Sequence, residues 1–370
     1  MTNLQSLIPK GKLVFTFAEN QLHKLVSTYP ESFPMYTQAG KWKHGGEAWT
    51  NWCEGFLGGQ LWLVYLHNRN SWWLEKAEHY SRLIEARKTD RHVHDLGFLF
   101  WPTWKRWYDL TGDAEKNAVV IEAGETLAKR FQENGQYLCS FIGEHSLFID
   151  IMMNVGIIFY AARQTKDVDL WQIALQHSLT SRRYLVRGDG STAHEGIFDT
   201  QTGAFLHQST HQGWRGDSSW ARGLAWAMYG FGSVYSFTHE ARFLKTAEAC
   251  ADFYIENTPT HGVPPNDWME QNSQFPYESS AAAIAASGLF NLSRLTNDQG
   301  KSENYYRYAL TILDTLTGPE FLANETPGWE GILKHGIYHI HKLLGVDESV
   351  MWGDYFFMEA LAKVLGYVTE

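Results

Sequence analysis

The chain has 370 residues, 44% of them hydrophobic, and a formal net charge of −10 at pH 7. This length and apolar content are ample for one large core. No linker or low-complexity stretch interrupts the chain, so we expect a single domain that spans residues 1–370. The acidic balance, without a basic run, argues against nucleic acid and anionic membranes as partners.

The sequence carries no signal for membrane insertion or export. No run of about 20 apolar residues could span a bilayer, and Met1 to Phe17 lacks the sustained apolar core of a signal peptide. The three cysteines, Cys53, Cys139 and Cys250, are widely spaced. This pattern fits free thiols in a reducing compartment better than disulfides or a zinc site. We therefore expect a cytoplasmic protein.

Hydrophobic periodicity predicts helices along almost the whole chain. Segments that are apolar on all sides alternate with segments that have one polar face, and the pair recurs about six times. An all-round apolar helix must be enclosed by others, and stacked helix pairs indicate a repeat architecture. We predict an all-α fold, an (α/α)6 barrel. The enclosed helices are expected at 49–67, 95–108, 148–163, 218–236, 279–295 and 351–365; the half-exposed ones at 20–29, 72–88, 113–132, 167–184, 240–256 and 303–317; and short hairpins at 194–205 and 263–268.

The predicted inner helices begin with polar or aromatic residues. In an alternating barrel all inner helices run the same way, so their N-termini meet at one mouth. Unsatisfied backbone N–H groups and positive dipole ends favour an anionic ligand there. Asp and Ser are also ordinary N-caps, which is the alternative explanation. The residues concerned are Trp49, Trp52, His94, Asp95, Asp150, 218–222, 278–280 and 352–354.

Asp95 and Asp150 are the best candidates for chemistry, because carboxylates rarely lie in apolar runs unless they are paired or used. Two carboxylates in one water-poor site push their pKa values apart and leave one of them protonated near neutral pH. Asp150 follows Phe148 and Ile149 directly, so we assign it the raised pKa and the role of general acid. The alternative is that both are buried helix caps.

His92 and His94 could be read as a metal-binding fragment, but no downstream ligand cluster completes it. We predict no metal and no cofactor, and we place His94 in the site beside Asp95. The chain also lacks a Gly-rich phosphate loop, a Gly-x-Ser-x-Gly run and a cysteine nucleophile motif.

A second dense cluster lies at 210–226. Trp220 and Trp226 can stack on sugar faces, and Arg222 can pair with a carboxylate. For Trp226 a place in the core is the alternative. His194, before the first predicted hairpin, could donate to a substrate hydroxyl.

Several runs, taken together and in order, carry a family resemblance over about residues 49–365. They are His94-Asp95-Leu96-Gly97-Phe98-Leu99, Ile149-Asp150 with Asn154, 181–187, Thr210-His211-Gln212-Gly213, Ser219-Trp220-Ala221-Arg222-Gly223, and Trp352-Gly353-Asp354-Tyr355 with 359–361. In these runs the chain resembles the unsaturated glucuronyl hydrolases, glycoside hydrolase family 88, whose members are (α/α)6 barrels.

The resemblance implies a substrate and a mechanism. Members of this family remove the 4,5-unsaturated uronic acid that polysaccharide lyases leave at the non-reducing end of oligosaccharides, such as glycosaminoglycan disaccharides. They hydrate the C4=C5 vinyl ether, with one aspartate as proton donor and activator of water. Asp150 matches that aspartate and Asp95 the assisting one. The positions that match substrate contacts are Trp52, His194, Gln212, Trp220 and Arg222.

Three regions depart from the family pattern. A Gln-Ala-Trp run before the catalytic aspartate is replaced by 137–141, a Thr-Phe-Tyr run after His194 by 195–197, and a Ser-x-x-Ser-x-Lys run tied to sulfated substrates by 339–344. The aglycone and its sulfation pattern stay open.

Two other enzymes remain as alternatives. One is the related barrel that removes unsaturated galacturonic acid from rhamnogalacturonan, which would keep the Asp150 chemistry. The other is a sugar epimerase that uses histidines such as His94 and His211. A non-enzymatic sugar-binding module is disfavoured, because binding alone needs no buried carboxylate pair.

Overall fold

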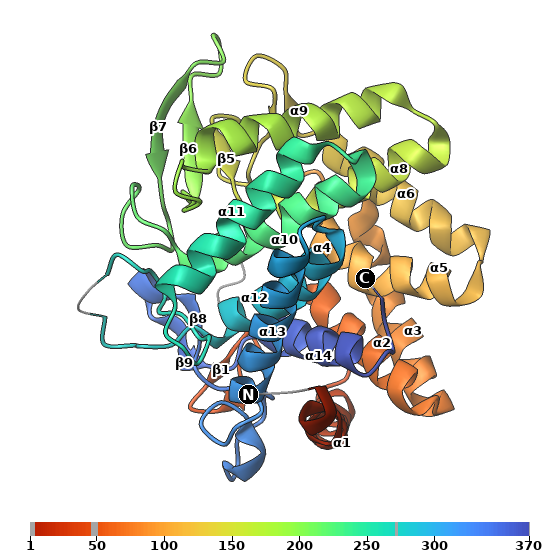
Figure 1. Ribbon diagram of the computed structural model, residues 1–370. Helices are drawn as coiled ribbons and strands as arrows, with labels where there is room; N and C mark the ends of the chain where they lie inside the picture. Colours follow the sequence, from red (N-terminus) through yellow and green to blue (C-terminus); the bar gives the residue numbers. More distant parts are fainter. Residues whose placement is uncertain (1–3, 46–50, 271–272, 370) are drawn as a thin grey trace.

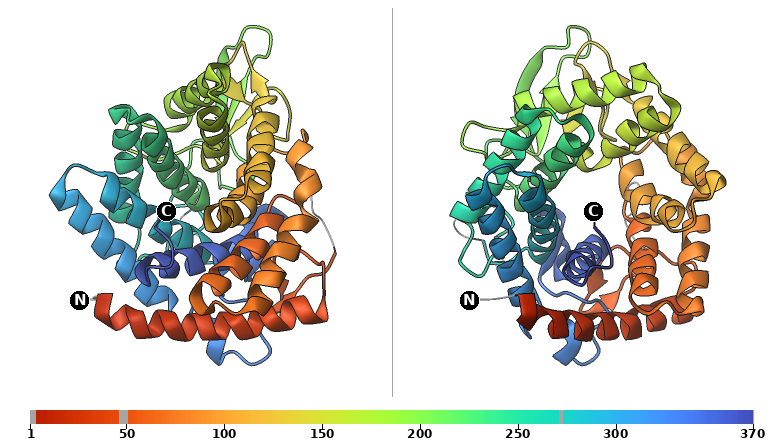
Figure 2. Two further views of the ribbon diagram at one scale, coloured as in Figure 1. Left: turned by 90° about the vertical axis from the view of Figure 1, so that its right-hand side faces the viewer. Right: turned by 45° about the vertical axis from the view of Figure 1, so that its right-hand side comes forward.

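A computed structural model describes residues 4–45, 51–270 and 273–369. Its helices form a ring in two layers, and the right-hand view of Figure 2 looks roughly along the axis of this ring. Trp49, expected at the start of the first inner helix, lies outside the described residues.

The inner layer closes on itself. Each inner helix packs against the next around the ring, and the last, α14, packs against the first, α2. Nearly every residue of α10 from Ala221 to Val234 is buried. A Cβ on Gly230 would lie 2.5 Å from the carbonyl oxygen of Met152, so only glycine permits this approach of α7 and α10. The inner helices are α2 (Glu54–Asn68), α4 (Leu96–Phe100) continued by α5 (Arg106–Thr111), α7 (Ile151–Asn154) continued by α8 (Gly156–Thr165), α10 (Ala221–Thr238), α12 (Ser279–Leu295) and α14 (Met351–Val364).

The outer helices cover the inner ones with one apolar face each. In α11 the buried Phe243, Ala247, Cys250 and Tyr254 recur at helical spacing, as a half-exposed helix requires. The predicted (α/α)6 barrel is therefore confirmed. The outer helices are α1 (Leu4–Thr28), α3 (Ser71–Leu83), α6 (Ala114–Ala128), α9 (Val168–Leu185), α11 (Ala241–Asn257) and α13 (Gln299–Leu316).

Two predicted helices differ in their extent. The outer helix expected at 20–29 begins at Leu4, because Gly11 packs against Leu361 of α14 and Leu365 just beyond it, although glycine is a poor helix former. The inner helix expected at 95–108 is interrupted by a π turn, Trp101–Lys105. Pro102 lies in this turn and has no N–H to donate, which accounts for the break.

Short strands join the helix layers at one end. The predicted hairpin at 194–205 is present as β6 (Glu195–Phe198) and β7 (Phe205–Ser209), and β6 also pairs with β5 (Ser146–Phe148). The hairpin predicted at 263–268 is wrong, since Asp267 makes only an isolated bridge with Trp220. A hairpin that was not predicted, β8 (Gly336–His339) with β9 (Leu344–Glu348), precedes α14. The remaining strands are β1 (Thr37–Gln38), β2 (Lys41–Trp42), β3 (Phe131–Gln132) and β4 (Tyr137–Leu138), and the labelled strands lie on the left in Figure 1.

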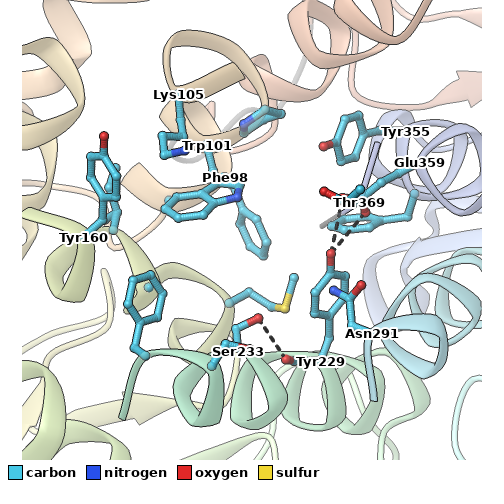
Figure 3. A pocket seen from close by; sticks show the side chains of 18 of the residues that line it. Phe98, Trp101, Lys105, Tyr160, Tyr229, Ser233, Asn291, Tyr355, Glu359 and Thr369 are labelled. Carbon is cyan, nitrogen blue, oxygen red and sulfur yellow. Dashed lines mark hydrogen bonds between the residues drawn. The ribbon is translucent and has the colours of Figure 1, made fainter. Parts of the chain in front are cut away.

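A cavity of about 550 Å³ lies inside the ring of inner helices. Figure 3 shows it lined by aromatic side chains such as Phe98, Trp101 and Tyr160, with Glu359 at one side. On α10 its lining begins at Tyr229, and the first turn of that helix holds Arg222. Seven residues of helix separate these positions by roughly 10 Å. We call this space the axial cavity, and the end at which the inner helices begin the N-terminal mouth.

Candidate active site

Asp95 and Asp150 lie at the N-caps of α4 and α7, two neighbouring inner helices. Neither side chain makes a capping hydrogen bond. By contrast, Glu278 at the start of α12 accepts from the backbone N–H groups of Ser280 and Ala281. Helix capping therefore does not explain the two aspartates. Asp150 Oδ2 is buried without a hydrogen-bond partner, which leaves it available for chemistry.

Each aspartate faces a histidine of defined tautomer. His94 Nδ1 accepts the N–H of Phe141 at 3.1 Å, and His194 Nδ1 accepts the N–H of His211 at 3.2 Å. A backbone N–H can only donate, so the ring proton of each neutral histidine is on Nε2. These Nε2 atoms lie 3.4 Å from Asp95 Oδ1 and 3.8 Å from Asp150 Oδ2.

Burial sets the charge of these groups. It lowers the pKa of His94 and of His194 well below the usual value, so both rings are neutral. Burial raises the pKa of Asp150 to about 6, against an opposing effect of Arg222. Burial, and then the charge of Asp150, raises the pKa of Asp95 well above its usual value.

The sequence predicts the raised pKa on Asp150. The structure raises the pKa of both aspartates by burial, and the charge of Asp150 raises that of Asp95 further, whereas Arg222 opposes the rise for Asp150. The protonated form of Asp95 is therefore favoured, and the pKa of Asp150 is about 6.

Arg222 lies beside Asp150, where the sequence placed it, and is 1% exposed. Its guanidinium lies over the ring of Trp220 at 4.5 Å and over that of Trp352 at 5.0 Å. It donates to Gln212 Oε1 and to the carbonyls of Ile337 and Tyr338. Much of its donor capacity is therefore used in joining α10 to β8.

The two other predicted tryptophans are placed differently. Trp52 is partly exposed at the N-terminal mouth, 4.6 Å from the ring of Trp352. Trp226 is 0% exposed and packs between Phe98 and Phe356, so the prediction that it contacts substrate is wrong and the core alternative holds. It lies on the same face of α10 as Arg222, one turn further from the N-terminal mouth.

Sequence reasoning missed Glu195, a buried carboxylate next to His194. The signal was available, since Glu195 stands in the mostly apolar run 193–198, as Asp150 does in its own run. It also missed Tyr338, because β8 was not predicted.

Two negative findings apply to the described residues alone. Within 4–45, 51–270 and 273–369, no three His, Cys, Asp or Glu side chains are grouped so that they could hold a metal ion. In the same ranges no helix combines the length and apolarity needed to cross a membrane.

Comparison with known proteins gives close relatives, although no protein-family model matches the chain. It is 32% identical to the unsaturated glucuronyl hydrolase of Formosa agariphila over 361 residues, 94% of this chain and 89% of that one. It is also 32% identical to the unsaturated chondroitin disaccharide hydrolase of Streptococcus agalactiae, over 85% of this chain and 81% of that one.

Solved structures agree with these relatives. The unsaturated glucuronyl hydrolase of Bacillus sp. GL1 matches with a TM-score of 0.89 at 26% identity, over 95% of this chain and 96% of that one. One specific for heparin matches with a TM-score of 0.90 at 27% identity, over 97% of both chains. A barrel of this kind, with two buried aspartates at one mouth and these relatives, is a glycoside hydrolase. The chain belongs to the unsaturated glucuronyl hydrolase family.

Proposed function

We propose that the chain removes the 4,5-unsaturated uronic acid from the non-reducing end of lyase-generated, glycosaminoglycan-type oligosaccharides. The observation that carries this proposal is the unpartnered Asp150 Oδ2, on a carboxyl whose pKa is raised to about 6 by burial. Relatives named for unsaturated glucuronyl and unsaturated chondroitin disaccharide hydrolysis support the substrate class.

The reaction needs a neutral acid next to carbon. Asp150 gives its proton to C4 of the vinyl ether, which leaves oxocarbenium character at C5 that the ring oxygen stabilises. Water then adds at C5, and the ionised Asp150 accepts its proton. The hemiketal opens and the aglycone leaves, so Asp150 ends the cycle protonated again.

The neighbours of Asp150 fit their parts in this cycle. His194 presents Nε2–H toward Asp150 Oδ2 and can stabilise the ionised carboxylate. Neutral Asp95 adds no second negative charge to the site. We assign substrate contacts to the groups that border this pair: Trp52, His94, His194, Gln212, Trp220 and Arg222.

The test is an incubation with two purified lyase products, an unsaturated chondroitin disaccharide and an unsaturated rhamnogalacturonan disaccharide, while the double-bond absorbance is followed. We expect the absorbance to fall faster with the first. Faster loss with the second would favour the rhamnogalacturonyl alternative. Stable absorbance with both, and turnover of a saturated sugar, would favour an epimerase.

Two further parts of the proposal concern the whole chain. We propose that residues 1–370 act as one catalytic domain, supported by the packing of α1 against α13 and α14. A single calorimetric transition is expected, and two separate ones would contradict it. We also propose a cytoplasmic location, supported by the buried free thiols of Cys53, Cys139 and Cys250. Immunoblots of fractionated source cells would test it, and protein found outside the cytoplasm would contradict it.

A further inference from the structure

Glu195 is a buried carboxylate that the mechanism above leaves without a role. It opens β6 and is 1% exposed. The hydroxyl of Ser146 donates to its Oε1, and the Ser140 hydroxyl donates in turn to Ser146 Oγ at 2.7 Å. Its other oxygen, Oε2, lies 3.2 Å from Nε2 of His211. A buried carboxylate is costly unless it is paired, so its partner His211 is the group to follow.

His211 borders the acid pair. Its backbone N–H donates to His194 Nδ1 at 3.2 Å, and its ring lies 5.5 Å from that of Phe148. Burial raises the pKa of Asp150, and His211 is among the groups that oppose this rise, after Arg222 and the aspartate's own backbone N–H. The side chain is 42% exposed, whereas that of His194 is 0% exposed. His211 is therefore the histidine that a bound sugar can reach from solvent.

The charges and partners of the neighbouring cationic and histidine side chains also distinguish His211 from them. Burial lowers the pKa values of His94, His194 and His339, so these rings are neutral. Arg222 lies 3.9 Å from Glu278 and donates to three acceptors of the protein. His211 is paired with the buried Glu195 through Nε2 and, unlike Arg222, has a side chain that is 42% exposed.

We infer that His211, held through Nε2 by Glu195, presents Nδ1–H to the carboxylate of the unsaturated uronic acid, and that Glu195 is the positioning residue for this contact. The inference rests on the proposed function and deepens it. A carboxylate on one ring nitrogen fixes the orientation of the imidazole. The N–H on the other ring nitrogen then meets the substrate's negative charge next to C5, where water adds.

The experiment tests whether the effect of removing the negative charge of Glu195 depends on the negative charge of the substrate. Glu195→Gln keeps the volume and removes the negative charge. Steady-state kinetics are measured for an unsaturated chondroitin disaccharide and for its uronate methyl ester, which has no negative charge. With the free uronate we expect Glu195→Gln to raise KM about tenfold and to change kcat less than twofold. With the ester, wild type and variant should have equal KM values within a factor of about two.

Matched variants separate positioning from folding. Asp354 is a buried carboxylate at the start of α14 that accepts from the N–H groups of Ile332 and Leu333, so Asp354→Asn controls for loss of a buried, hydrogen-bonded carboxylate. It should leave the ratio of free-uronate to ester KM unchanged. Glu195→Asp should recover part of the lost affinity. If Glu195→Gln does not fold, His211→Gln provides the same test at an exposed side chain.

The outcomes are distinct. If wild type does not turn over the disaccharide, the proposed function fails and this inference fails with it. If wild type turns over the disaccharide, but Glu195→Gln changes KM equally for uronate and ester, Glu195 is structural and only this inference is overturned.

Discussion

The two ends of the barrel differ in whether the buried polar groups named below have hydrogen-bond partners. At the N-terminal mouth, Asp150 Oδ2, His194 Nε2 and Trp220 Nε1 are buried without hydrogen-bond partners. At the axial cavity, Glu359 is 4% exposed but accepts from Tyr229 and Ser287, as Figure 3 shows for Tyr229. Lys363 donates to the same two hydroxyls.

The volume of a cavity alone therefore does not identify the part of the molecule in which the reaction takes place. The axial cavity is lined largely by aromatic and aliphatic side chains, and the protein satisfies the polar groups named above. A buried polar atom without a partner costs about 1–3 kcal/mol, so three of them gathered at one mouth mark a candidate ligand site. The following changes test whether the N-terminal mouth alone carries the activity.

The largest effect is expected from Asp150→Asn, which keeps the shape and removes the transferable proton. We expect kcat to fall by at least the ~10²–10⁴-fold typical of general acid–base catalysis, with binding retained. Double-bond absorbance measures turnover, and calorimetric titration with the disaccharide measures binding. Near-normal turnover by a folded variant would move the acid role to Asp95.

Next in size is the dependence of wild-type kcat on pH. Burial raises the pKa of Asp150 to about 6, and the reaction needs the protonated carboxyl. Activity is therefore present below that value and is lost as pH rises through it, by about tenfold per pH unit above it. A kcat profile from pH 5 to pH 8 checks this. A profile that stays flat to pH 8 would contradict the assignment of the acid.

Arg222→Ala should act mainly on affinity. We expect KM to rise roughly 10- to 100-fold, the range for a hydrogen bond to a charged group, with a smaller change in kcat. The variant should also unfold at lower temperature, because Glu278 loses its buried cation. Kinetics and thermal unfolding, compared with Arg222→Lys, check both effects. A variant that lost kcat and kept KM would place Arg222 in the chemical step instead.

Asp95→Asn should lower activity less than Asp150→Asn or Arg222→Ala does. Burial already keeps Asp95 neutral, so asparagine reproduces its charge and loses one hydroxyl donor. We expect kcat to fall about tenfold or less. The same absorbance assay, run beside Asp150→Asn, decides the ranking, and a larger loss than in Asp150→Asn would reverse the two roles.

The barrel, and the placement of Asp95 and Asp150 at one mouth, could be predicted from the sequence, because both depend on local patterns. Alternating enclosed and half-exposed helices predict the layers, and an isolated carboxylate in an apolar run marks Asp95 and Asp150. Long-range packing decided the rest. The backbone groups that fix the tautomers of His94 and His194 come from residues 141 and 211. Arg222 is held by carbonyls more than 100 positions away. No local pattern contains such contacts.

The smallest expected effect on activity comes from filling the axial cavity. Gly156 opens α8 and lines the cavity, and a Cβ there would meet only Phe237, at an ordinary 3.6 Å. In Gly156→Leu the new side chain gains apolar burial, and the helix loses its glycine, which costs about 1 kcal/mol relative to alanine. We expect the unfolding temperature to rise by about 2–4 °C and kcat/KM to stay within twofold of wild type. Calorimetry and the absorbance assay measure the two quantities. A clear loss of activity in a stable variant would show that the two ends of the barrel are coupled, since α7 and α8 join Asp150 to the cavity wall, and it would break the contrast between them.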